Sequence, residues 1–141
     1  MQANQRLVVE AAYASWEEED LSLLACVLHD KAVSHIRLPP GAWPMAGVLR
    51  GKAAVLAGLG RVAQNFQVAE YRPTKMKGED GIWTCRARVQ YAHRTSGLIY
   101  QATISNVWTI LGDKITTYEV IHDAELLRTF FDLVQRSEEK V

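Results

Sequence analysis

The fold of this protein is decided by residues 68–122, which read VAEYRPTKMKGEDGIWTCRARVQYAHRTSGLIYQATISNVWTILGDKITTYEVIH. Strand-forming segments alternate there with short turns rich in Gly, Asp and Ser, at 78–81, 95–97 and 112–113. Such turns join the strands of β-hairpins. We therefore predict an antiparallel meander with strands at about 68–77, 82–93, 98–111 and 114–122.

Helical spacing of apolar residues marks the N-terminal part of the chain. Val9, Tyr13 and Trp16 recur on one face, which predicts an amphipathic helix over residues 4–18. A second, short helix follows, and Asp20 is a suitable N-cap for it. Together these segments predict a helical hairpin.

A strand and a loop come next. Residues 32–38 are rich in strand-forming residue types, and Pro39-Pro40-Gly41 ends the strand because proline removes backbone donors. The loop over residues 39–51 carries Trp43 and Met45, whose large apolar side chains are unfavourable in water. We therefore predict that this loop folds over the domain as a lid.

Two further helices complete the pattern. Apolar residues at helical spacing predict a helix over residues 51–66, in which Gly58 and Gly60 indicate a close contact between helix and sheet. A final helix over residues 124–137 is expected to bury Leu126, Leu127, Phe130, Phe131 and Val134.

This order of elements predicts the fold class. Helices followed by hairpin-connected strands are typical of an α+β domain with its helices on one face of an antiparallel sheet. A length of 141 residues suits one core, so we expect a single domain over residues 1–141. A strongly curved sheet would form a cone, with helices packed on its concave face and enclosing an apolar pocket.

Composition limits the partners. Lys plus Arg and Asp plus Glu are equal at 16 each, which gives no excess charge for nucleic acid or a membrane surface. No apolar run approaches the roughly 18 residues of a membrane span, and the N-terminus has no signal-peptide pattern. Cys26 and Cys85 lie in apolar surroundings and are expected to be reduced, which fits a cytoplasmic protein.

Five motifs match a known family: the helix with Tyr13 and Trp16 before Asp20-Leu21, Pro39-Pro40, Gly47-Val48-Leu49-Arg50-Gly51-Lys52, Gly112-Asp113-Lys114-Ile115, and Tyr118-Glu119-Val120-Ile121-His122-Asp123-Ala124. Through them nearly the whole chain resembles the SnoaL-like, ketosteroid-isomerase-like family of the cone-shaped, nuclear-transport-factor-like superfamily. The resemblance implies the cone fold. It does not fix the reaction, because this scaffold supports isomerases, dehydratases, cyclases, hydrolases and pure binding proteins.

The resemblance also implies a catalytic position. SnoaL-like polyketide cyclases place an acid/base aspartate at the end of the last strand, where this chain has Asp123. A carboxylate at an apolar pocket is suited to proton transfer. The alternative is that Asp123 only caps the final helix, since aspartate is a preferred N-cap. Strand alternation sends His122 to the opposite face, so only one of the two is expected to face the pocket.

Other polar side chains have weaker assignments. His35, on the first strand, is a second candidate proton donor or acceptor, and a structural histidine is its alternative. His29 and His93 lie near turns and are expected to be solvated. Arg86 and Arg88 share one strand face, which is either a polar outer face or a row that enters the pocket. No histidine spacing indicates a metal site, and we expect neither metal nor cofactor.

Aromatic residues are the predicted walls of the pocket, and each is also a candidate core residue. The candidates for substrate binding are Tyr13, Trp16, Trp43, Tyr91, Trp108 and Tyr118.

Two functions remain open at this point. One is a cofactor-independent isomerase, dehydratase or cyclase acting on a small apolar or aromatic carbonyl compound. The other is a non-catalytic ligand-binding or subunit-assembly module.

The resemblance further implies a homodimer, since these cones commonly pair through the outer faces of their sheets. One face of the strand over residues 98–111 has a mildly polar, β-branched character that suits such a contact. Its residues are Gln101, Thr103, Ser105, Val107 and Thr109.

Overall fold

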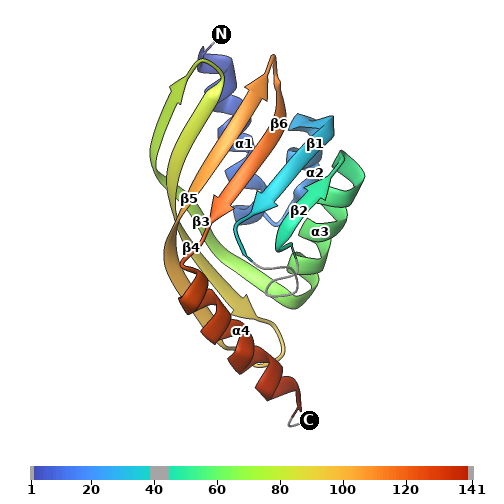
Figure 1. Ribbon diagram of the computed structural model, residues 1–141, viewed down its shortest axis with the longest axis vertical. Coiled ribbons are helices and arrows are strands. Elements are labelled where there is room, and N and C mark those ends of the chain that lie inside the picture. Colours follow the sequence, from blue (N-terminus) through green and yellow to red (C-terminus); the bar gives the residue numbers. More distant parts are fainter. Residues whose placement is uncertain (1, 39–44, 140–141) are drawn as a thin grey trace.

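The computed structural model describes residues 2–38 and 45–139, and its four helices and six strands form an α+β fold (Figure 1). In chain order the elements are α1 (Gln2–Glu17), α2 (Leu21–Val27), β1 (Leu28–Ile36), β2 (Gly47–Arg50), α3 (Lys52–Asn65), β3 (Phe66–Glu79), β4 (Ile82–His93), β5 (Ile99–Leu111), β6 (Lys114–Ile121) and α4 (Ala124–Glu139).

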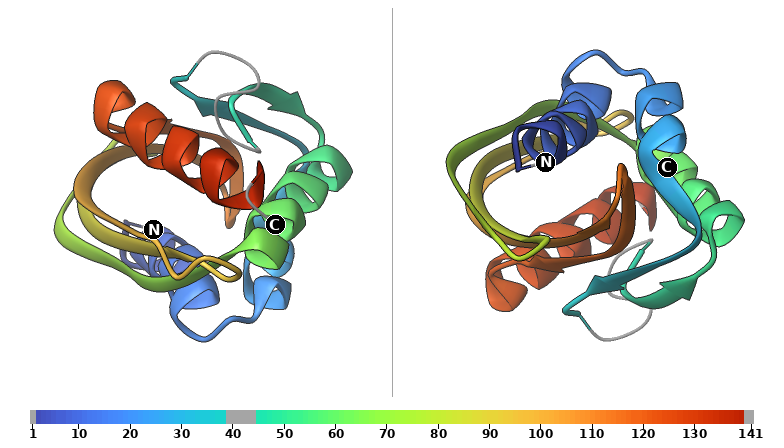
Figure 2. Two further views of the ribbon diagram at one scale, coloured as in Figure 1. Left: turned by 90° about the horizontal axis from the view of Figure 1, so that it is seen from below. Right: turned by 90° about the horizontal axis from the view of Figure 1, so that it is seen from above.

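The six strands form one sheet in the order β2-β1-β6-β5-β4-β3. Neighbouring strands are antiparallel except β1 and β6, which run parallel. The sheet curves strongly without closing, and the helices flank the hollow side of the curve (Figure 2). The predicted meander of β3 to β6 and the predicted α+β cone are confirmed.

Strand alternation places one row of β4 inside the curve and the other outside. Cys85, Ala87 and Val89 are buried, whereas Arg86 and Arg88 are exposed. Arg88 Nε lies 3.7 Å from Glu70 Oε1 of β3, an ion pair on the outer surface. The arginine row therefore belongs to the polar outer face, and it does not enter the hollow of the sheet.

A buried hydrogen-bond network fastens α1 to the concave face. The Tyr13 hydroxyl donates to Asn106 Oδ1 at 2.7 Å, and Asn106 Nδ2 donates to the Tyr71 hydroxyl at 3.3 Å. Trp108 Nε1 donates to the Tyr13 hydroxyl at 3.3 Å. Because Asn106 is fully buried, these partners supply the hydrogen bonds that water cannot.

The N-terminal elements differ from the prediction at one boundary. Asp20 caps α2 as expected, because its Oδ1 accepts from the Ser22 backbone N–H at 3.0 Å. The first strand, however, begins at Leu28 and not at residue 32. Leu28 is the C-cap of α2 and already has extended backbone angles, so the helix passes directly into the strand.

The predicted lid segment contains a short strand, β2, that the sequence pattern did not indicate. It pairs antiparallel with β1 and forms the edge of the sheet. Met45 precedes it and is buried. Trp43, the other expected lid residue, lies outside the described residues.

Burial of the later helices agrees with the prediction in part. A Cβ at Gly58 would lie 2.7 Å from Leu49 Cδ1 of β2, so the expected close helix-to-sheet contact exists there, whereas Gly60 has open space. On α4, Leu126 is exposed and Phe131 is only half-buried, which corrects two of the five expected core positions. The buried residues of α4 are Leu127, Phe130 and Val134.

The remaining correction concerns His93, which was expected to be solvated near a turn. It is 2 % exposed, because it ends β4 on the same inward row as Tyr91. Its Nδ1 lies 2.7 Å from Ser96 Oγ, and its Nε2 lies 3.2 Å from Glu138 Oε1 of α4. Within residues 2–38 and 45–139, no helix is long and apolar enough to cross a membrane.

Two glycines at hairpin turns allow a matched test of the close packing between the β3–β4 turn and β5. Gly81 and Gly97 have nearly equal positive φ angles, 78° and 76°, but only a Cβ at Gly81 would meet backbone, 2.9 Å from the Ile110 oxygen. Both Gly→Ala variants should lose about 1–2 kcal/mol from the left-handed backbone. Gly81→Ala should lose at least about 1 kcal/mol more, from overpacking. Urea unfolding measures both, and equal losses would contradict the close approach of Gly81 to β5.

Candidate functional site

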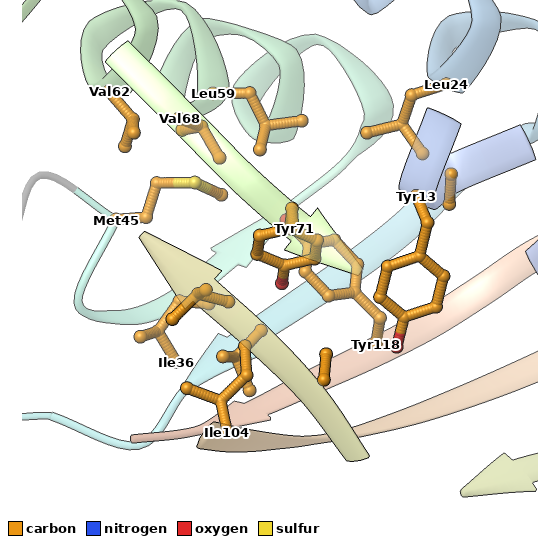
Figure 3. Close-up of a cluster of buried hydrophobic side chains, with 14 of the residues drawn as sticks. Tyr13, Leu24, Ile36, Met45, Leu59, Val62, Val68, Tyr71, Ile104 and Tyr118 are labelled. Carbon is orange, nitrogen blue, oxygen red and sulfur yellow. The ribbon is translucent and has the colours of Figure 1, made fainter. Parts of the chain in front are cut away.

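A cavity of about 40 Å³ lies between the concave face of the sheet and helices α1, α2 and α3. Tyr71 lies at the centre of the surrounding cluster, and Met45 and Leu24 approach it from opposite sides (Figure 3). Among the described residues that line it, none has a carboxylate, ammonium or guanidinium group. Its aromatic and imidazole side chains are Trp16, Tyr71, Tyr91, Trp108, Tyr118 and His122.

One polar pair in this lining is formed by Tyr91 of β4 and His122, the residue after β6. The Tyr91 hydroxyl and His122 Nε2 are 3.0 Å apart and form a buried hydrogen bond. Tyr100, the partner of Tyr91 across the β4–β5 hairpin, stacks on the Tyr91 ring with centroids 5.4 Å apart. The pair is thus held by the sheet itself, with its rings oriented by packing.

Burial keeps both members of this pair neutral. It lowers the pKa of His122 to about 4, because a charged imidazolium would lose its hydration there. Burial also raises the pKa of Tyr91 well above its ordinary value, and the nearby tyrosines add to that shift. At neutral pH the site therefore offers an uncharged imidazole and an uncharged phenol, which can donate and accept hydrogen bonds.

Four of the six aromatic residues predicted to bind substrate line the cavity, namely Trp16, Tyr91, Trp108 and Tyr118. Tyr13 is absent from the lining and instead belongs to the Asn106 network beside it. The sixth, Trp43, is outside the described residues. A role in substrate binding stays a prediction for all six.

The two predicted catalytic residues lie elsewhere. Asp123 is exposed, and its Oδ1 accepts from the Leu126 backbone N–H at 3.1 Å, which makes it the N-cap of α4. His35 is half-buried on β1, on the strand face opposite to the buried Ser34 and Ile36. Neither residue lines the cavity, and their catalytic roles stay predictions.

Two of the aromatic and imidazole residues that line the cavity were not selected from the sequence. His122 lines the cavity on the same inward row as Tyr118 and Val120, so the alternation rule pointed to it and the family resemblance favoured its neighbour. Tyr71 had no such signal, because β3 contains two register shifts that disturb its alternation.

A larger cavity of about 340 Å³ adjoins the inner one. Trp16 and Val68 line both, so these two side chains form a shared wall. Exposed Glu19 and Arg94 also line the larger cavity, which places its other side at the surface. A small molecule therefore has a route from solvent to the wall at Trp16. In the part of the chain that is described, no three His, Cys, Asp or Glu side chains gather as a metal site.

Comparison with known proteins identifies relatives by family and by fold. The SnoaL-like domain matches residues 9–118. No curated protein matches the chain. An NTF2-like protein from Burkholderia xenovorans LB400 is similar in structure, with a TM-score of 0.77 and 18% identity over 92% of this chain and 96% of that one.

Two other solved structures contain small molecules. TerC, co-crystallised with polyporic acid, has a TM-score of 0.76 and 17% identity over 92% of this chain and 98% of its own. A protein with a ketosteroid isomerase-like fold from Catenulispora acidiphila, in complex with trimethylamine, has a TM-score of 0.70. It is 13% identical over 82% of this chain and 84% of its own. At such low sequence identities, these similarities show a shared fold and nothing more specific.

Burial of His122 predicts a pH dependence of stability. The unfolded chain binds the His122 proton with a pKa near 6.5 and the folded chain with one of about 4, so protonation in that window favours unfolding. Stability should be complete above about pH 6.5 and fall by roughly 3 kcal/mol as the pH drops to about 4. Urea unfolding at several pH values measures this.

His122→Gln should flatten that dependence, and the half-buried His29, changed to Gln, serves as the control. If the free energy of unfolding depended on pH equally in the two variants, His122 would have to be accessible to protons in the folded state.

Proposed function

The chain belongs to the SnoaL-like domain family, and from this premise we propose that it binds a small apolar compound in its inner cavity and holds one oxygen of that compound at Tyr91 and His122. The observation that carries the proposal is the buried hydrogen bond between those two side chains. Ligand sites are typically apolar with a few placed polar groups that set orientation and specificity, and this lining has that composition.

The neutral state of the pair selects the chemistry of the ligand. A neutral imidazole has one donor and one acceptor nitrogen, and a phenol hydroxyl can do both. A carbonyl or hydroxyl oxygen can exchange hydrogen bonds with such a pair without bringing a charge into an apolar site. A charged group in the inner cavity would lose its hydration without gaining an opposite charge, so the ligand is uncharged there.

Aromatic walls favour a compact, flat ligand. Trp108 and Tyr118 stack with centroids 5.1 Å apart and present an extended ring surface, and Trp16 and Tyr71 add two more rings. Because the cavity holds only about 40 Å³, a ligand of one ring must displace side chains, and the larger cavity beyond Trp16 and Val68 offers the space. Polyporic acid, found with the structural neighbour TerC, supports an organic ligand for this fold.

Acid/base catalysis is the second candidate function, favoured by the burial that keeps His122 as the imidazole base. In a β,γ-unsaturated ketone, His122 would remove a proton from the carbon between the carbonyl and the double bond. Returning that proton to the far end of the double bond gives the conjugated ketone, with no net change in atoms or electrons. Tyr91 would donate to the carbonyl oxygen as charge develops on it.

Asp123 is the alternative acid/base residue for this proton transfer. The family resemblance favours it, but its exposure and its bond to the Leu126 N–H support a capping role, which in turn supports the binding function over catalysis. His35 is the weaker alternative, because its strand face is turned away from the cavity lining.

Binding of 4-propylphenol, an apolar molecule with one hydroxyl, tests the proposal. Calorimetric titration should show saturable binding to the wild type, and Tyr91→Phe should weaken it about fivefold through the loss of one hydrogen bond. Asp123→Asn should leave the affinity unchanged. Absence of saturable binding, or equal affinities for wild type and Tyr91→Phe, would contradict the proposed site.

The same variants separate binding from turnover. Conversion of cyclohex-3-enone to cyclohex-2-enone, followed by ultraviolet absorbance, should be lost in His122→Gln and kept in Asp123→Asn if His122 carries the proton. The opposite pattern, with folding intact, would assign the step to Asp123. A wild type that binds ligands without any conversion would leave the non-catalytic binding function.

We also propose a homodimer formed through the outer face of the sheet. On β5, Gln101 and Thr103 are exposed, and Ser105, Val107 and Thr109 are half-buried, so the face expected to pair is turned away from the cavity. Its β-branched residues can pack against a second copy without exposing a large apolar patch in the free chain.

Light scattering during size-exclusion chromatography tests this pairing. The wild type should elute with twice the 15.8 kDa mass of one chain, and Val107→Arg should convert it to the monomer. Leu133→Arg, at an apolar α4 residue that is 46 % exposed, is the matched control and should remain dimeric. Dissociation by Leu133→Arg alone would move the interface to α4.

A further inference from the structure

A pair of hydroxyl groups lies in the sheet four residues before His122. Tyr118 of β6 lines the inner cavity, and Ser34 of β1 is its register partner on the neighbouring strand. Partners in register on adjacent strands project from the same face of a sheet, so Ser34 lies beside Tyr118, although Ser34 itself is not among the residues that line the cavity. Figure 3 shows Tyr118 within the cluster of buried hydrophobic side chains.

The two hydroxyls of this pair are buried without the set of hydrogen bonds that other polar groups in the core have. Ser34 is 0 % exposed and Tyr118 is 5 % exposed. Apart from its contact with the Tyr118 hydroxyl, Ser34 Oγ has no hydrogen-bond partner among the described residues. The Ser34 hydroxyl is the polar neighbour of Tyr118, and burial raises the Tyr118 pKa above its ordinary range. A buried hydroxyl without a full set of partners is unfavourable unless something occupies the site for part of the time.

The polar groups of the nearby Asn106 network differ from this pair in their hydrogen bonds. Tyr13, Tyr71 and Asn106 satisfy one another through a continuous chain of hydrogen bonds. Around the hydroxyl pair, by comparison, Trp108 stacks on the Tyr118 ring, and the next inward residues on the two strands are the apolar Ile36 and Val120. The protein thus satisfies its structural polar network and leaves hydrogen-bonding capacity on the Tyr118 hydroxyl at the cavity and on Ser34 beside it.

We propose that Tyr118 and Ser34 form a second oxygen-binding position, and that the ligand is a compact, uncharged compound with oxygen functions at two opposite ends. The inference rests on the proposed function, in which Tyr91 and His122 hold the first oxygen. Tyr118 lies on β6, and His122 follows the end of that strand four positions later, which is about 13 Å between Cα atoms for extended backbone. Both residues line the cavity. A ring with a hydroxyl or hydroxyalkyl group at each end is the class that fits.

Matched pairs of phenols test the second position. Hydroquinone, 4-hydroxybenzyl alcohol and 4-(2-hydroxyethyl)phenol differ from 4-methylphenol, 4-ethylphenol and 4-propylphenol, respectively, by a terminal hydroxyl in place of a methyl group. At least one diol should bind about fivefold more tightly than its partner, the value of one added hydrogen bond. Since hydroxyls carry no charge, this preference should not change with salt concentration.

Tyr118→Phe and Ser34→Ala should each abolish the preference while keeping the affinity for the monohydric partner. Tyr100→Phe is the matched control for Tyr118→Phe, because the Tyr100 hydroxyl is also buried, without a hydrogen-bond partner among the described residues, yet Tyr100, unlike Tyr118, does not line the cavity. This variant should keep the preference. A preference that survives in both Tyr118→Phe and Ser34→Ala, or diols that bind no better than their partners, would overturn the inference.

Stability without ligand gives a second readout. If the Ser34 hydroxyl serves a ligand, Ser34→Ala should unfold at the same or higher urea concentration than the wild type, since it removes an uncompensated buried group. A lower midpoint would assign Ser34 a structural bond and overturn the inference. If monohydric phenols bind as predicted and only the diol preference fails, the proposed function stands; if none of the six phenols binds, both fail.

Discussion

The hydrogen bond from the Tyr13 hydroxyl to Asn106 fixes the distance between α1 and the middle of the sheet. Asn106 is fully buried on β5, so its amide must find partners within the protein, and Tyr13 and Tyr71 connect it to α1 and β3, while Trp108 of β5 donates to the Tyr13 hydroxyl. This network sets how closely the helix approaches the concave face. Tyr71 and Trp108 of this network, together with Ala12 and Trp16 of α1, also line the cavity, so the network and the cavity share a wall.

The polar side chains that line the cavity are uncharged. The charged side chains of β4 point outward, where Arg88 pairs with Glu70 on the surface. Inside, burial suppresses ionisation, and polar contacts are made by phenols, an imidazole and hydroxyls. Such an interior is suited to an uncharged ligand with oxygen atoms and flat rings, because a buried ion would lose its hydration there. Binding and proton transfer at His122 would both depend on this exclusion of charge.

Much of the fold was predictable because its long strands repeat a simple pattern. The alternation of β4 and the turns at residues 78–81 and 112–113 predicted the meander and its inward rows. The edge strand β2 was missed because four residues within a loop carry no periodic signal. Leu126 and His93 were misjudged because helix rotation and hairpin packing are set by tertiary contacts.

The candidate site was less predictable than the fold. Alternation along β6 was sufficient to place His122 on the inward row with Tyr118, whereas the cap position alone could not decide whether Asp123 also faced a cavity. Residues brought together from separate strands, such as Tyr91 and His122, left no local signal. Their meeting depends on the curvature of the sheet, which residue spacing does not specify.

The parallel pairing of β1 with β6 has a consequence for the order of folding. Ser34 and Tyr118 are register partners although 84 positions (118 − 34) separate them in the chain. Contacts between distant residues form late, because the intervening chain must first lose much of its freedom. During synthesis β1 is made early and has no neighbour on that side until β6 emerges. The hairpins of β3 to β6 can therefore assemble first, and the wall of the cavity, to which Ile36 of β1 contributes, is completed only when the N-terminal strand docks.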